Sequence, residues 1–232
     1  MSQQHITESI CSAPVGRLAF GTFYFRFTPV KRHILSGRYA KYSMRKTAIL
    51  GGPKQFSLGV HMIFVTEGFT IRKIYENDVD TIFRVYKGSE DFLSLGPEPK
   101  ASKDMVFKDI ESSAKTGGIY CLILNKEEEE IGIVDFIPNM YKENPRYGYI
   151  SLIMIKSEYR NKGYGKKVVD LIEGIMQKQH QVEKVFVSIQ ENNAKGIKFW
   201  ERKGYKIFSE PELQPDKTIV LHMEKDLSKY EE

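Results

Sequence analysis

A basic segment with two glycines, Tyr159-Arg-Asn-Lys-Gly-Tyr-Gly-Lys-Lys167, contains the residues whose types and spacing could bind a ligand. It lies between an apolar run that ends at Ile155 and an apolar periodic segment that begins near Gly165. A turn from strand to helix exposes the backbone N–H groups of the first helical turn, and glycines let a ligand approach without meeting a Cβ atom. The helix dipole and the nearby cations favour a negative charge there. The segment therefore predicts an anion-binding loop suited to a pyrophosphate, with four cations around it: Arg160, Lys162, Lys166 and Lys167.

Taken alone, this segment is better explained as a tight connection from strand to helix with a solvated basic face. The two widespread nucleotide fingerprints do not fit it, because no third glycine follows at the Rossmann spacing and no G-x-x-x-x-G-K-[ST] string occurs. The two cysteines and five histidines are dispersed and lack the spacing of common zinc sites. We therefore expect neither a metal ion nor a disulfide framework.

Periodic segments around the loop predict the strands and helices that would hold it. The patterns from residue 119 to residue 155 are typical of an antiparallel meander, and those from 147 to 189 of a β-α-β unit. The predicted class is α/β or α+β with a mixed sheet. Expected strands are 63–65, 69–74, 119–124, 131–137, 147–155, 184–189, 205–208 and 218–223, and expected helices are one from about residue 79, then 101–115, 165–179 and 194–203.

The charge distribution separates the chain into two regions. Residues 1–61 carry nine basic residues and one acidic residue, so the remainder is slightly acidic although the 232-residue chain has a net charge of +5. Glycines and prolines interrupt every apolar run of residues 1–61. We interpret this segment as an irregular basic leader, either a transit peptide or an appended or mis-started extension. Residues 62–232 form the expected domain, and no stretch reaches the length of a membrane span. A cytoplasmic location is predicted, since two cysteines far apart in the sequence give no disulfide framework and fit a reducing compartment.

Two motifs at a characteristic separation resemble one family. Arg160-Asn-Lys-Gly-Tyr-Gly165 resembles the Q/R-x-x-G-x-G/A signature of the GNAT acyltransferases. The segment from Asn193 to Tyr205 is similar to that family's N-x-x-A-x-x-x-Y-x-x-x-G-F, with Gly196 for alanine, Trp200 for tyrosine and Tyr205 for phenylalanine. The resemblance covers about residues 69–224 and indicates a small N-acetyltransferase of the bacterial type.

The resemblance implies a central, largely antiparallel mixed sheet flanked by helices, with acyl-CoA, most simply acetyl-CoA, held at a splayed strand pair. It places the pyrophosphate on the glycine loop and the pantetheine arm beside the backbone of Ile153 and Ile155. Asn193 would contact the pantetheine, cap the last helix, or do both. The residues expected to bind the co-substrate are Ile153, Ile155, Arg160, Asn161, Lys162, Gly163, Tyr164, Gly165, Lys166 and Asn193.

The reaction implied by the resemblance is direct attack of a neutral amine on the thioester, with a backbone N–H near Ile153 or Met154 stabilising the oxyanion. Trp200 stands where many members place an acidic tyrosine hydroxyl, so no general acid is assigned. Asp135, Tyr147 and Tyr149 lie on strands that could border the acceptor, and none of them is singled out as the base. Cys121 is interpreted as a core residue.

The acceptor side is less specific. The segment from Tyr86 to Lys103 should help to hold an amine, which could belong to a small molecule, a peptide or a protein. We expect no nucleic acid and no membrane as partners, and a homodimer is left open. Two rival functions remain. One is a degenerate domain that binds acyl-CoA without transfer, and the other is a binder of nucleic acid or anionic surfaces that uses the basic leader and the cluster from Lys162 to Lys167. The sequence leaves the acyl-chain length undetermined.

Overall fold

The computed structural model describes residues 41–42 and 63–228. The chain separates into compact units 1–38 and 39–232, and all described residues belong to the second unit. Apart from Lys41 and Tyr42, the predicted leader lies outside the described residues. These two residues form strand β1 (Lys41–Tyr42), which pairs antiparallel with β2 (Ile63–Val65). The leader analysis did not predict this strand, because two residues are too few to give a periodic pattern.

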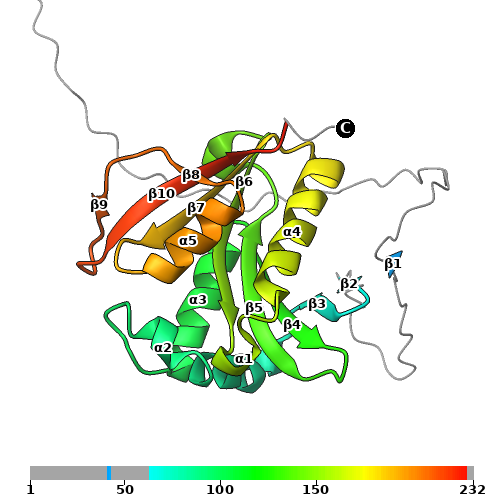
Figure 1. The fold of residues 1–232 in the computed structure, drawn as a ribbon. Helices are drawn as coiled ribbons and strands as arrows, with labels where there is room; N and C mark the ends of the chain where they lie inside the picture. Colours follow the sequence, from blue (N-terminus) through cyan, green and yellow to red (C-terminus); the bar gives the residue numbers. More distant parts are fainter. Residues whose placement is uncertain (1–40, 43–62, 229–232) are drawn as a thin grey trace, which may run out of the picture. The chain divides into compact units, whose positions relative to one another are not determined.

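The described strands form one mixed sheet in the order β1-β2-β3-β4-β5-β6-β7-β10-β8, with β9 also paired to β10 (Figure 1). Every neighbouring pair is antiparallel except β6 and β7, which are parallel and are joined through the longest described helix. The remaining strands are β3 (Phe69–Lys73), β4 (Ile119–Asn125), β5 (Glu130–Ile137), β6 (Tyr147–Ile155), β7 (Lys184–Gln190), β8 (Lys206–Ile207), β9 (Glu212–Leu213) and β10 (Ile219–Asp226).

The helices begin and end at the signals that the sequence provides. Ser102 accepts a hydrogen bond from the Met105 amide at the start of α3, and Gly204 takes a left-handed φ of 88° shortly after α5. The helices are α1 (Val79–Lys87), α2 (Glu90–Leu93), α3 (Lys103–Lys115), α4 (Tyr164–His180) and α5 (Ala194–Arg202), and the 3-10 turns are η1 (Glu76–Asp78), η2 (Tyr141–Glu143) and η3 (Ser157–Tyr159).

Apolar side chains alternate along the strands and give the sheet two packed faces. On one face, Cys121, Val134 and Ile150 pack with α4, which contributes Val168 and Ile172. On the other face, Tyr120, Leu122, Ile133 and Met154 pack with α1 and α3. In Figure 1, α4 and α5 lie in front of the sheet and α3 lies behind it. The sheet therefore has α4 on one face and α1 with α3 on the other.

Strands β6 and β7 separate halfway along their length. Their parallel pairing runs from Tyr147↔Lys184 to Ile150↔Val187 and ends there. A bulge follows at once, because β5 pairs Phe136 with Ile150 and Asp135 with Leu152, which leaves Ser151 as an extra residue. The second half of β6 therefore has β5 on one side and no paired strand on the other among the described residues.

The predicted fold class is confirmed: a mixed, mostly antiparallel sheet is flanked by helices, with the meander and the β-α-β unit in their expected places. The expected strands at residues 63–65 and 147–155 have the observed limits, and the other limits agree or differ by one or two residues, except that the last strand extends to Asp226. The short elements α2 and β9 were not predicted. No helix in the described part of the chain is long and apolar enough to cross a membrane.

Candidate functional site

The loop before α4 presents a row of unpaired backbone donors. Within residues 63–228, no group accepts a hydrogen bond from the N–H groups of residues 161–166, and pairing resumes where Lys167 donates to the Gly163 carbonyl at 3.1 Å. Asn161 and Gly163 both have left-handed backbones, with φ of 60° and 83°. Alternating handedness of this kind turns successive N–H groups to one side and makes a nest for an anion.

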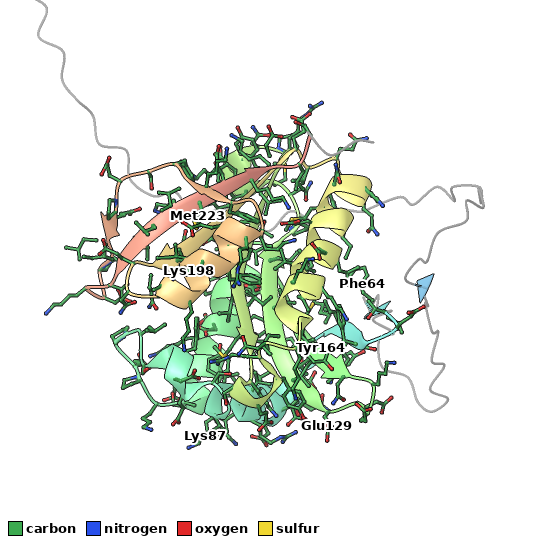
Figure 2. The ribbon with its side chains drawn as sticks, viewed as in Figure 1. Phe64, Lys87, Glu129, Tyr164, Lys198 and Met223 are labelled. Carbon is green, nitrogen blue, oxygen red and sulfur yellow. The ribbon has the colours of Figure 1, made fainter. Side chains whose placement is uncertain are left out.

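The two glycines of the loop have different surroundings. A Cβ atom on Gly163 would meet nothing within 4 Å, so the space beside it is open, although the positive φ disfavours other residues. A Cβ atom on Gly165 would stand 3.6 Å from the Phe199 ring. Tyr164, between them, is labelled in Figure 2 and is half-buried. Its ring makes an edge contact with Phe69 of β3, with 6.4 Å between the ring centres. The residue whose missing side chain leaves room for a ligand is therefore Gly163.

Arg160 is engaged with protein groups. Its Nε donates to the Ile155 carbonyl at 2.7 Å, and its two Nη atoms bind the Asp91 carboxylate of α2. This guanidinium holds the pKa of Asp91 below its ordinary value. Arg160 thus joins the loop to α2, and an incoming phosphate would compete with Asp91 for it.

The other cations of the loop remain at the surface. Lys162, Lys166 and Lys167 are exposed, and the Lys162 ammonium lies 5.1 Å from the centre of the Tyr159 ring. Such charges raise the local concentration of an anion but are screened by salt. The predicted cluster is therefore assembled at the start of α4, where the helix dipole adds to it.

The backbone groups of Ile153 and Ile155 point toward the gap between β6 and β7. The Lys156 N–H donates to the Ile131 carbonyl of β5 at 2.9 Å. Since hydrogen-bonded and non-bonded residues alternate along an antiparallel pair, the backbone N–H and C=O of Met154 face β5, and those of Ile153 and Ile155 face away from it. The Ile155 carbonyl accepts from Arg160, whereas no described residue is recorded as a partner of the Ile153 backbone. An extended ligand could pair with Ile153 as a strand would.

Asn193 caps α5, which was one of the two roles that the sequence suggested for it. Its side-chain oxygen accepts from the Gly196 amide at 2.9 Å. The departure from the family motif at Gly196 has a steric reason: a Cβ atom there would lie 2.5 Å from Ile189 Cδ1 and 2.6 Å from Asn193 Nδ2. Asn193 follows the end of β7 by three residues.

Trp200 packs in the core. It is 6% exposed and makes edge contacts with Phe199 at 5.1 Å and Tyr205 at 4.8 Å. Cys121 is fully buried, and burial raises the pKa of its thiol to about 12. Neither side chain is placed to transfer a proton or to attack a carbonyl, in keeping with their interpretation as packing residues.

A cavity of about 410 Å³, with two aspartates among its lining residues, opens on the face of the sheet opposite α4. It reaches the β6 bulge, where Ser151 and Leu152 form part of its wall. Asp135, 7% exposed, accepts hydrogen bonds from Ser113 at 2.6 Å and from Ser151. The remaining lining residues are Asp109, Ser112, Thr116, Tyr120, Ile137, Tyr141 and Tyr149.

Burial gives the cavity wall a distinct electrostatic character. Desolvation raises the pKa of Asp109, and the nearby Asp135 charge raises it further. The Tyr86 hydroxyl donates to Asp109 and lies 2.8 Å from the Tyr120 hydroxyl. Two carboxyl groups facing one cavity favour a positively charged occupant. Of the three suggested bases, Asp135 and Tyr149 line the cavity, whereas Tyr147 packs on Phe186.

Sequence reasoning missed Asp109 and Ser151 as cavity residues. Asp109 has the ordinary appearance of a polar helix position, and a bulge leaves no mark in the hydrophobic pattern of β6. Among the described residues, no group of three or more His, Cys, Asp or Glu side chains is arranged to hold a metal ion.

A sequence model of the acetyltransferase (GNAT) family matches residues 82–205, which is more than half of the chain. The chain belongs to the GNAT acetyltransferase family. It is therefore an acyl-CoA-dependent N-acetyltransferase that uses acetyl-CoA as co-substrate. Comparison with curated proteins finds no match.

Solved structures share the fold of this GNAT protein at low sequence identity. Spermidine N-acetyltransferase from Vibrio cholerae, in complex with CoA and spermine, has 18% identity and a TM-score of 0.55, covering 70% of this chain and 97% of that one. An acetyltransferase from Thermus thermophilus has 15% identity and a TM-score of 0.57, covering 68% of this chain and 97% of that one.

Proposed function

We propose that the protein transfers an acetyl group from acetyl-CoA to a primary amine of a small cationic acceptor, by direct attack in a ternary complex. The observation that carries this proposal is the row of unpaired amides at residues 161–166, because it lies next to the unpaired edge of β6. One acetyl-CoA molecule can bind the amides of residues 161–166 with its pyrophosphate and the unpaired edge of β6 with its pantetheine arm. The carboxylate-lined cavity then meets the same strand from the opposite face.

In this proposal, the pyrophosphate lies on the amides of Asn161 to Lys166. Gly163 leaves the approach open, and exposed Lys162 and Lys166 add charge. Arg160 adds to the binding of the pyrophosphate when a phosphate oxygen replaces the Asp91 carboxylate at its guanidinium. The pantetheine arm runs beside β6, where it can donate to the Ile153 carbonyl, and it passes Ile155 and Asn193 on its way from the loop.

Acetyl-CoA supplies the activated carbonyl, and the protein supplies position and polarity. The Ile153 N–H points into the gap and is the better placed of the two suggested oxyanion donors, since the ladder directs the Met154 N–H toward β5. No covalent enzyme intermediate is needed. Because the thiolate of coenzyme A is an acceptable leaving group near neutral pH, it can depart unprotonated and take its proton from water afterwards.

The acceptor is proposed to occupy the cavity on the α3 face. Asp109 and Asp135 would attract an ammonium group, and the β6 bulge brings the acceptor next to the strand that holds the acetyl group. The structural similarity to a spermidine N-acetyltransferase supports polyamines as the first acceptors to try. An amine with a second positive charge would gain from both carboxyl groups.

The test is release of CoA from acetyl-CoA with spermidine and a panel of amino sugars, peptides and monoamines, with product mass as the second readout. Transfer to a cationic small amine is expected. The variant Asp135→Asn should raise the acceptor KM at least about tenfold and leave the acetyl-CoA KM unchanged. Glu111→Gln, an exposed neighbour on α3, is the matched control.

Tight acetyl-CoA binding without transfer to any amine would contradict the proposal and would favour a domain that only binds acyl-CoA. An unchanged acceptor KM in the Asp135→Asn variant, with activity intact, would place the acceptor elsewhere.

A further inference from the structure

Three aromatic rings surround the ammonium group of Lys142. The Lys142 Nζ atom lies 5.4–5.6 Å from the centres of these rings, which belong to Tyr141, Phe186 and Phe208. The negative face of an aromatic ring attracts a cation at such distances, and proteins use several rings together to bind alkylammonium groups. The three rings therefore form an aromatic cage for a cation, and a lysine of the chain itself occupies it.

Separate parts of the chain supply the walls of the aromatic cage. Phe186 lies on β7, Phe208 follows β8, and Tyr141 belongs to η2, while β7 and β8 flank β10 in the sheet (Figure 1). Phe186 is 6% exposed and contacts the rings of Tyr141, Tyr147 and Phe208, with centre distances of 5.0–5.6 Å. Phe208 is 44% exposed. The cage thus has a buried wall at Phe186 and an outer wall at Phe208.

The aromatic cage adjoins the proposed acceptor cavity. Tyr149 pairs with Phe186 between β6 and β7. Ile150, the next residue, packs on the α4 face, so Tyr149 and Phe186 point to the opposite face, where the cavity opens. Tyr141 lines the cavity together with Tyr149, and the two rings stack at 4.5 Å. An extended ligand in the cavity can therefore reach the cage past the Tyr141 ring.

Lys142 is an occupant that can be exchanged. It is exposed, so its ammonium group can move out of the cage into water. Met140, Lys142 and Glu143 have left-handed backbones, with φ of 64°, 52° and 61°, which residues other than glycine rarely adopt. Such a turn keeps its conformation only while its surroundings hold it. Departure of Lys142 from the cage would thus let the turn relax.

The charges near the aromatic cage favour a cation in it. The exposed Glu212 carboxylate is close enough for His222, and more weakly Lys142, to hold its pKa below the ordinary value. Lys184, a second cation beside the cage, pairs with Glu224 at 2.8 Å. An ammonium group that replaces Lys142 would therefore keep the attraction of Glu212.

We propose that the cage of Tyr141, Phe186 and Phe208 binds an ammonium group of a linear polyamine acceptor, and that this group displaces Lys142. The inference rests on the proposed acceptor cavity. An ammonium held on ring faces is stabilised in its charged form, whereas the amine that attacks the thioester must be neutral. The cage therefore holds a remote nitrogen of the acceptor, while another amine of the same molecule reacts in the cavity.

The first test compares kcat/KM for spermidine with that for 1-aminobutane, which has no second ammonium group. Lys142→Ala empties the cage and should raise kcat/KM for spermidine about two- to fivefold, the size of a cation–π contact at an exposed site. Phe208→Leu removes the outer wall and should lower it by a similar factor. Neither variant should change kcat/KM for 1-aminobutane or the acetyl-CoA KM. Lys126→Ala, in the exposed turn between β4 and β5, is the matched control and should behave as the wild type.

Two outcomes of these kinetics overturn the proposal. Lys142 is not a competing occupant if Lys142→Ala leaves kcat/KM for spermidine unchanged, or changes it equally for spermidine and 1-aminobutane, as loss of a nearby charge alone would do. The Phe208 ring does not contact the acceptor if Phe208→Leu keeps the wild-type melting temperature and the wild-type kcat/KM for spermidine.

The second test measures binding without transfer, with tetramethylammonium as the probe. Its methyl protons move upfield in the proton NMR spectrum when they lie on ring faces. The full chain with Lys142→Ala should give a saturable upfield shift, the wild type a weaker one, and the double variant Lys142→Ala with Phe208→Leu a much smaller one. No shift in Lys142→Ala, or equal shifts in all three proteins, would contradict the cage.

Failure of the cage and failure of the proposed function give different results. Absence of transfer to any amine by the wild type would refute the proposed function, and the tetramethylammonium titration would still decide whether the cage binds a cation. Transfer to spermidine and to 1-aminobutane with equal kcat/KM in the wild type and in both variants would leave the proposed function standing and refute the cage.

Discussion

At the scale of single residues, Arg160 belongs to the family motif and also makes contacts within the protein that the motif does not predict. The sequence predicts a phosphate ligand, and the structure places its guanidinium on Asp91 and the Ile155 carbonyl. The Asp91 carboxylate is 59% exposed, and exposed ion pairs contribute only about 0–1 kcal/mol. A doubly charged pyrophosphate can therefore compete for the guanidinium.

Arg160→Ala should raise the acetyl-CoA KM several-fold at low ionic strength and less at high ionic strength, because exposed charges are screened. Asp91→Asn removes the competing anion and should leave this KM unchanged or lower it. Steady-state kinetics at two salt concentrations measure both. An equal loss at every salt concentration in Arg160→Ala would show that the bond to the Ile155 carbonyl is the important one.

Trp200 gives a second prediction at this scale. Because it packs between Phe199 and Tyr205, Trp200→Phe should retain most of kcat, whereas Trp200→Ala should lose about 3–5 kcal/mol of unfolding free energy through a cavity. Kinetics and chemical denaturation measure the two effects. A large loss of kcat in a stable Trp200→Phe variant would give the indole a role in the reaction.

At the scale of the elements, periodicity and capping predicted most of the sheet and its helices, because each strand buries one recognisable face. The loop before α4 was predicted together with its glycines. The strand gap was expected from family resemblance, and the bulge at Ser151 was not predicted at all, since one extra residue in a ladder depends on the partner strand. The cavity depends on how α3 packs against β5 and β6, which lie far from α3 in the sequence or are paired through a bulge, and the local pattern of a single sequence does not show this.

Two roles are open to Asn193 at the start of α5, namely capping of the helix and contact with acetyl-CoA. Its oxygen caps the helix, and no acceptor for its Nδ2 is found within residues 63–228. Asn193→Ser keeps a capping oxygen and removes Nδ2, so it should retain stability and weaken acetyl-CoA binding. Asn193→Ala should also lose about 1 kcal/mol of unfolding free energy. Denaturation and calorimetry distinguish the two, and wild-type affinity in Asn193→Ser would limit this residue to capping.

At the scale of the whole molecule, both family motifs and the cavity that contains Asp109 and Asp135 lie in residues 63–228, whereas the basic charge is concentrated in residues 1–61. The described contact with that segment is the pairing of β1 with β2 at Lys41↔Val65 and Tyr42↔Phe64. Two residue pairs at the edge of the sheet add little to its stability.

A chain that begins at Met62 should therefore match the full chain in acetyl-CoA affinity and in melting temperature to within a few degrees. Calorimetry and thermal unfolding of the two chains side by side make the comparison. Aggregation of the shorter chain, or a clearly lower melting temperature, would show that the segment belongs to the fold.

The most direct test of the account is whether the loop before α4 recognises phosphate. Calorimetry compares the binding of acetyl-CoA and of S-acetylpantetheine, which lacks the nucleotide and its pyrophosphate, to the wild type and to Gly163→Val. The wild type should bind acetyl-CoA much more tightly, and the valine should remove most of that preference while the affinity for S-acetylpantetheine stays constant. A folded Gly163→Val variant with an undiminished preference for acetyl-CoA would contradict the account and place the pyrophosphate elsewhere.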